Sequence, residues 1–254
     1  SRGLGDVYKR QVIMLIGLAG CGKNQINIKE TGTSDNNEQM VQNIYENKRT
    51  EVKQKISEIK ERLPETSAED KGTCGSKAKW YYKDNTLIIY GEGVITEDTW
   101  HKSNIVINTV VIDSGITKLG NNMFSGLGSE VGKNIENFYI ADGLEEIGSS
   151  TFVNCDCLSE IVLPPSLYFI DGYTFASCDS LKKIYMTDGV EKIGDSAFTG
   201  CKSLESIFIP KTVRAIGNGV FTGCNNLSDI QISKDNRIFL SLIHISEPTR
   251  PEPI

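Results

Sequence analysis

The sequence predicts a repeat solenoid, because several residue types recur every 23 positions in the second half of the chain. The phenylalanine column, for example, is Phe152, Phe175, Phe198 and Phe221. Isoleucine, cysteine and leucine form further columns in the same register: Ile147, Ile170, Ile193 and Ile216; Cys155, Cys178, Cys201 and Cys224; Leu158, Leu181, Leu204 and Leu227. One apolar face per unit cannot bury itself, so the units must stack on one another. We expect about five coils over residues 106–239.

Each coil is predicted to hold one short strand and one helical turn. The pattern LxxIxI alternates as a strand does and ends at Pro164 or Pro210 in two units. Stacked coils then form a parallel sheet along one side. Glycine after the isoleucine, as at Gly194, predicts a turn, although Asp171 replaces it in one unit. We expect the segment around each phenylalanine to form the helical turn on the opposite side.

A β-hairpin is predicted over residues 71–105, as a cap for the first coil. The segment KWYYKDNTLIIYGEG contains two runs of aromatic and β-branched residues around Lys83, Asp84 and Asn85. A solenoid needs such an end to cover its apolar edge, and Trp80 and Leu87 can supply that cover.

Residues 22–70 are predicted to be a polar tether that contains a helix at about 36–63. Asp35 and Glu38 have capping-box spacing. Apolar residues then recur at helical spacing, at Val41, Tyr45, Val52, Ile56, Ile59 and Leu63. The helix is interpreted as a stalk or short coiled coil. The alternative, an amphipathic helix docked on its own domain, stays open.

Residues 12–21 resemble a bacterial lipoprotein signal. The apolar run VIMLIGL is followed by LAGC, in which Cys21 is the residue that such a signal lipidates after cleavage. This run is too short to span a bilayer. Gly17, Gly22 and Lys23 also fit a phosphate-binding loop, but Asn24 stands where that loop needs a hydroxyl, so we favour the lipoprotein signal.

Both chain ends resemble a translated sequencing-library adapter. Residues 1–11 read SRGLGDVYKRQ and residues 240–250 read LSLIHISEPTR. All antiparallel pairs of these residues can be encoded by reverse-complementary codons, such as Gly3 with Pro248. We therefore expect residues 1–11 and 240–254 to be artefacts, and the natural protein to extend further in both directions.

The repeats resemble the BspA-like leucine-rich-repeat family of bacterial surface proteins. The unit EKIGDSAFTGCKSLESIFIP and the preceding segment GTCGSKAKWYYKDNTLIIYGEG carry this resemblance. It implies a leucine-rich-repeat solenoid and a role in adhesion to host matrix, host cells or other microbes. A lipid anchor at Cys21 agrees with a location on the extracellular face of a bacterial membrane.

Composition argues against several other functions. The net charge is −6, from 33 acidic and 27 basic residues, and no basic stripe is present, so nucleic acid is not expected as a partner. The chain has two histidines, His101 and His244. We find no nucleophile paired with a base, no carboxylate pair and no zinc spacing. We therefore predict no catalytic site, no metal and no cofactor.

Four of the cysteines are predicted to pack in the core, because they lie in one inward column. Cys157 is expected to face outward, either as a free thiol or paired with Cys74.

The candidate binding residues are Tyr139, Tyr185 and Phe208, which share an outward strand position. Stacked side chains in that column would form a rigid, exposed aromatic stripe. The alternative is that these residues only favour strands and pack against their own column.

We therefore expect a lipid-anchored surface module that binds host or microbial proteins or glycans. The alternative is the non-catalytic repeat region of a larger surface enzyme.

Overall fold

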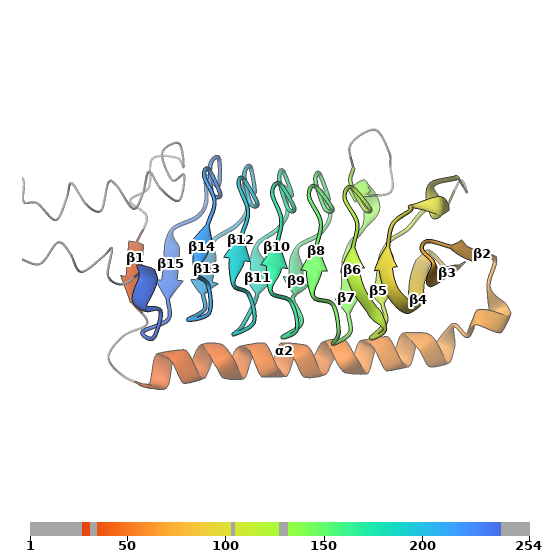
Figure 1. Ribbon diagram of the computed structural model, residues 1–254, viewed down its shortest axis with the longest axis horizontal. Coiled ribbons are helices and arrows are strands. Elements are labelled where there is room, and N and C mark those ends of the chain that lie inside the picture. The colour runs from red at the N-terminus through yellow and green to blue at the C-terminus, as the bar shows by residue number, and fades with distance from the viewer. Residues whose placement is uncertain (1–26, 31–34, 103–104, 127–131, 240–254) are drawn as a thin grey trace, which may run out of the picture.

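The computed structural model is a solenoid whose coils stack in a row, with one long helix along its side (Figure 1). It describes residues 27–30, 35–102, 105–126 and 132–239. The predicted adapter ends, the predicted lipoprotein signal and Cys21 lie outside the described residues.

Each described coil contributes two parallel strands, except that of β15, which contributes one. The first set forms what we call the strand face: β5 (Thr109–Ile112), β7 (Asn137–Ile140), β9 (Glu160–Val162), β11 (Lys183–Tyr185), β13 (Ser206–Ile209) and β15 (Asp229–Ile232). The second set is β6 (Ile116–Leu119), β8 (Glu146–Ile147), β10 (Phe169–Ile170), β12 (Lys192–Ile193) and β14 (Ala215–Ile216). The second set was not predicted; four of its five strands have only two residues, which is too short to show an alternating pattern.

Glycine follows second strands, as at Gly194 after β12 and at Gly217 after β14, because neighbouring coils are in close contact there. A Cβ atom at Gly194 would lie 2.5 Å from the backbone nitrogen of Gly172 in the preceding coil, and one at Gly217 would lie 2.4 Å from that of Asp195. Neither glycine has a positive φ. A side chain is excluded there mainly because the neighbouring coil occupies the space.

The segment around each phenylalanine forms hydrogen-bonded turns rather than the predicted helical turn. Ser150, Tyr173 and Ser196 adopt left-handed φ values of 58°, 57° and 55°. Backbone N–H groups then point to the next coil: Phe175 donates to the Ala197 carbonyl at 2.8 Å. A helix would direct these bonds along the segment, whereas stacking directs them between coils.

The buried phenylalanines stack through the whole interior. Neighbouring rings from Phe124 to Phe221 lie 5.0 to 5.9 Å apart, with interplanar angles of 10° to 18°. Trp100 extends this stack toward the cap, 5.4 Å from Phe124. Every ring therefore depends on the coils on either side of it.

The cysteine column is buried next to the ring stack, as predicted. Cys178 donates from Sγ to the Phe152 carbonyl of the preceding coil at 2.9 Å, and Cys201 and Cys224 repeat the contact at 3.0 Å. Burial raises the pKa of the Cys178 thiol well above its usual range. Thiol groups fit this column because they are small and apolar yet can donate a weak hydrogen bond.

The predicted hairpin is present and covers one end of the solenoid. It consists of β3 (Lys77–Lys83) and β4 (Thr86–Ile95), with β2 (Asp70–Thr73) paired antiparallel to β3. The turn residues Asp84 and Asn85 have φ values of 49° and 57°, as a tight hairpin turn requires. Strand β4 pairs in parallel with β5, so the hairpin joins the repeat sheet directly. The short 3-10 segments are η1 (Glu65–Ser67), η2 (Thr99–Lys102) and η3 (Gly132–Asn134).

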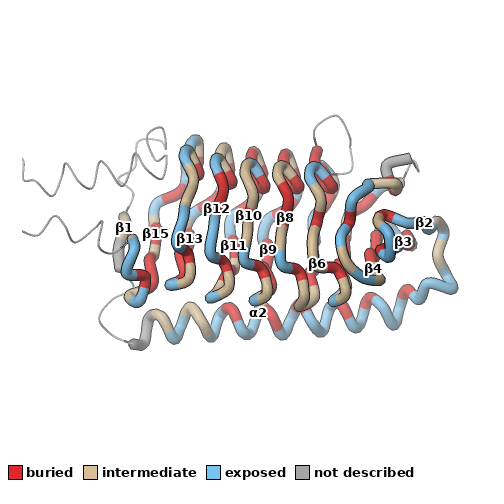
Figure 2. The backbone as a smooth tube through the Cα atoms, viewed as in Figure 1, coloured by how far each residue is buried: buried red, intermediate tan, exposed pale blue. Residues whose placement is uncertain are grey.

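Helix α2 (Asp35–Arg62) lies along the solenoid, so the stalk interpretation is wrong and the docked alternative is right (Figure 1). Its buried apolar residues, such as Tyr45 and Val52, pack against the strand face. Figure 2 shows buried positions recurring along the helix among exposed ones. Those side chains would face water in a projecting stalk. Ahead of it, β1 (Asn27–Glu30) pairs in parallel with β15.

Removing one ring from the stack tests the shared core. We expect Phe175→Ala to lower the free energy of unfolding by about 3–5 kcal/mol, because it opens a cavity between two coils. The exposed control Lys182→Ala is expected to change it by less than about 0.5 kcal/mol. Urea unfolding followed by circular dichroism measures both. A loss below about 1 kcal/mol for Phe175→Ala would contradict the shared core.

Candidate binding surface between helix α2 and the strand face

The outward column of the strand face is partly covered by helix α2. Val111 and Val162 are buried, and Tyr139, Tyr185 and Phe208 are half-buried. The column points out of the solenoid as predicted, but it is less exposed than the predicted stripe. Sequence periodicity revealed the direction of these side chains but not the element that packs over them.

Polar contacts fix helix α2 along several coils. The Tyr45 hydroxyl donates to the Leu163 carbonyl at 2.8 Å. The buried Arg49 donates to the Ile140 carbonyl at 2.9 Å and to Asp142 at 2.6 Å. These contacts make the helix a part of the folded domain rather than a loose covering.

The Asp142 carboxylate forms ion pairs with two cationic side chains of helix α2. Lys53 lies 2.7 Å from its second oxygen, opposite Arg49. Burial disfavours the charged form, but the hydrogen bonds from Lys53 and Arg49 outweigh it, so the pKa of Asp142 is lowered. The carboxylate is thus ionised in the folded protein over the whole neutral range.

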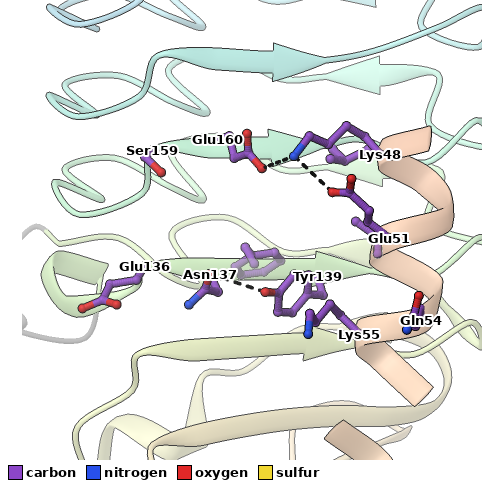
Figure 3. A pocket seen from close by; sticks show the side chains of 12 residues that line it. Lys48, Glu51, Gln54, Lys55, Glu136, Asn137, Tyr139, Ser159 and Glu160 are labelled. Atoms are coloured by element: carbon purple, nitrogen blue, oxygen red, sulfur yellow. Dashed lines mark hydrogen bonds and ion pairs between the residues drawn. The ribbon is translucent and has the colours of Figure 1, made fainter. Parts of the chain in front are cut away.

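A first pocket, of about 360 Å³, lies where the middle of helix α2 meets β7 and β9 (Figure 3). Tyr139 forms part of its wall, and burial raises the pKa of its phenol. Lys48 reaches across from the helix to Glu160 at 3.0 Å and also pairs with Glu51 of the same helix at 3.1 Å. Asn137 and Ser159 add neutral polar groups at the strand starts. The pocket therefore combines an aromatic ring with mixed charges and hydrogen-bonding groups.

A second, more apolar pocket of about 230 Å³ lies nearer the start of helix α2. Tyr185 and Phe208 line it from the strand face, and Met40 and Ile44 line it from the helix. Met40 is 58% exposed and Ile44 is 42% exposed, which is high for apolar side chains on a docked helix.

Both pockets lie where the ladder of the strand face is interrupted. Among the described strands, β7 is not joined to β9, and β11 is not joined to β13. The first pocket spans the β7–β9 interruption and the second spans the β11–β13 interruption. The interruptions thus coincide with the concave parts of the surface.

All three predicted binding residues line this surface: Tyr139 the first pocket, Tyr185 and Phe208 the second. Sequence reasoning missed the helix residues opposite them, such as Lys48 and Met40. No local signal could identify them, because their role depends on where the helix docks.

The described cysteines lie outside both pockets. Cys157 is exposed, Cys74 is buried, and both are free thiols, so they are not paired with each other. Burial raises the pKa of Cys74 to about 12. Within the described ranges, no group of three or more His, Cys, Asp or Glu residues is placed to hold a metal ion. No helix in that part of the chain has the length and apolar character needed to cross a bilayer.

A sequence profile of the family described as "BspA type Leucine rich repeat region" matches residues 130–243 in six copies. These residues belong to that repeat family. The resemblance noted from the unit motif is thereby confirmed, and the BspA-type repeats account for the strand face from β7 to β15.

Solved structures of bacterial leucine-rich-repeat proteins are similar to this chain. A leucine-rich repeat protein from Eubacterium ventriosum matches with a TM-score of 0.57 and 25% identity, over 66% of this chain and 45% of that chain. A leucine-rich cell surface protein from Faecalibacterium prausnitzii matches with a TM-score of 0.44 and 21% identity, over 66% and 56% respectively. The match thus covers less than two thirds of each of those proteins. No curated protein sequence matches the chain.

Thiol reactivity tests the placement of the cysteines. In a Cys21→Ser background, we expect a water-soluble disulfide reagent to modify Cys157 rapidly, because its thiol is exposed. The other five described cysteines are buried and should react only after unfolding. The control Cys157→Ser should remove the rapid phase, and a rapid phase that persists would contradict this placement.

Acidification tests the Asp142 contact. The pKa of Asp142 is lower in the folded state than in the unfolded state. The contact therefore stabilises the fold fully above the unfolded pKa of about 4, and this stabilisation is lost as the pH falls through the folded pKa. We expect Asp142→Asn to cost about 1 kcal/mol at pH 7, a charged hydrogen bond discounted for partial exposure. The free energy of unfolding of the parent and of the variant, measured from pH 7 to pH 2, should become equal at the acid end. A difference that stays constant would contradict the assignment.

Proposed function

We propose that this chain is a bacterial surface-binding module that recognises protein or glycan partners through the strand face and is held at the membrane by a lipid on Cys21. The observation that carries the proposal is the pair of pockets described above. They present three outward aromatic side chains on a rigid repeat scaffold. Half-buried aromatic residues beside concave surface are typical of recognition sites.

Family membership supports the location. The resemblance to the BspA-like family implies a surface protein, and the LAGC sequence would supply the anchor. Lipid modification adds about 0.8 kcal/mol per buried methylene, so more than one acyl chain gives stable attachment. The solenoid would then present its strand face outside the cell.

A binding role agrees with the chemistry of the two pockets. Neither pocket holds a cysteine or a histidine among its lining residues, and Lys48 in the first pocket is paired with Glu160 and Glu51. The hydrogen bond to Glu160 raises the pKa of Lys48, so it remains a cation rather than a base. Such groups can orient a ligand but offer no activated nucleophile.

Substitution of the second-pocket aromatics tests the recognition surface. The full chain is first screened against purified matrix proteins and a glycan array. We then expect Tyr185→Ser combined with Phe208→Ser to weaken binding of the ligand found by at least about tenfold, because truncated aromatic anchors cost about 2 kcal/mol or more.

The matched control is Tyr173→Ser, which removes an aromatic side chain that is 51% exposed on the turns rather than on the strand face. It should leave binding unchanged, and all variants should keep the circular dichroism spectrum of the parent. Equal binding by the parent and the double variant would show that the ligand is not recognised by the strand face. An absence of any ligand in the screen would contradict the binding role.

A further inference from the structure

The described chain enters the solenoid at the coil of β15, the last of the described coils. Strand β1 extends the strand face beyond β15, and all four of its residues are in register with that strand, from Asn27 opposite Asp229 to Glu30 opposite Ile232. Ile28 is partly buried and packs against the main core. Figure 1 shows β1 beside β15, at the opposite end of the solenoid from the hairpin cap.

Helix α2 then carries the chain back along the full row of coils. Near its start, Glu38 accepts a hydrogen bond from Ser233 in the last coil at 2.5 Å. At its end, the carbonyl of Leu63 accepts one from Tyr81 in the hairpin at 2.9 Å. A helix of 28 residues is about 42 Å long. The hairpin cap is therefore about 40 Å farther along the solenoid than the point where the chain enters.

The position of Cys21 limits the distance between an anchor and the last coil. Cys21 lies six residues before Asn27 in the sequence. Six residues span at most about 20 Å, even when fully extended. An anchor at Cys21 can thus reach no farther than about 20 Å from β1, which is half of the length of helix α2.

We infer that, of the described coils, that of β15 lies nearest the membrane and that the hairpin cap lies farthest from it. This inference rests on the proposed lipid anchor at Cys21 and adds the direction in which the module is held. The partner surface at the proximal end is the lipid bilayer itself. Along the strand face, the second pocket lies on the coils nearer the membrane, and the first pocket lies closer to the cap.

This arrangement differs from the one that the sequence predicted. A tether over residues 22–70 would have held the domain well away from the bilayer. With β1 and α2 packed on the solenoid, only residues 22–26 lie between Cys21 and β1 in the sequence. A short attachment and a long rigid row of coils then determine how far each pocket lies from the membrane.

Energy transfer to labelled lipids tests the direction. The chain from Val12 onward is produced in a bacterium behind a short basic leader and reconstituted into phosphatidylcholine vesicles that contain a rhodamine lipid. A donor dye is placed on Arg237→Cys in the last coil or on Lys71→Cys in the cap, both in a Cys157→Ser background. We expect transfer from position 237 to be at least about twofold more efficient than from position 71, given the separation of about 40 Å.

Mass spectrometry of Cys21 separates the two ways in which the inference can fail. An unmodified Cys21 would overturn the lipid anchor and, with it, the direction. A lipidated Cys21 with equal transfer from the two dyes, or with stronger transfer from position 71, would overturn the direction alone. The control Cys21→Ser should show no stable association with the vesicles.

A second variant tests the role of β1. Ile28→Asp should detach β1 from the core and lengthen the attachment to residues 22–34, which raises its maximum reach from about 20 Å to about 45 Å. The efficiency of energy transfer from position 237 should then fall toward that from position 71. An unchanged ratio of the two efficiencies would show that β1 does not set the distance between the coil of β15 and the membrane.

Discussion

Coil-on-coil stacking is the interaction on which the rest of the structure depends. Each coil from Phe124 to Phe221 contributes one phenylalanine ring to a continuous stack, and the four coils from Phe152 onward also contribute one thiol each that donates to the coil before it. The backbone also donates across each junction, as from Phe175 to Ala197. No coil can satisfy these groups alone, so stability grows with the number of neighbours and the ends need special cover. The hairpin supplies that cover at one end, and β1 extends the sheet at the other.

Helix α2 fits the strand face because two spacings nearly agree. A helix rises about 1.5 Å per residue, so one turn of 3.6 residues advances about 5.4 Å, close to the strand separation of about 4.8 Å. Successive turns therefore meet successive strands, and Tyr45, Arg49 and Val52 each reach a coil. The hydrogen-bonded ladder of the strands is interrupted at two places, and the two pockets lie at those interruptions. The candidate binding surface thus follows from the way a regular helix covers a less regular sheet.

The repeat period made most of the fold predictable from the sequence. Phe152 and its equivalents share one environment in every coil, so their spacing reveals both stacking and burial. The second strands could not be recognised, because two residues such as Lys192 and Ile193 show no periodicity. Docking of helix α2 was left open, since it depends on contacts such as that between Arg49 and Ile140, which are far apart in sequence. The outward direction of the aromatic column followed from the strand pattern, but its partial burial under helix α2 did not, for the same reason.

Hydrogen exchange of individual backbone amides measures the stacking most directly. The N–H groups of Phe152, Phe175 and Phe198 each donate to a carbonyl of the following coil, so they are protected only when coils are stacked. The stacking account predicts slow exchange at all three, with the greatest protection at Phe175 in the middle of the row. Fast exchange at these amides, while the rest of each coil stays protected, would show that the coils fold as separate units.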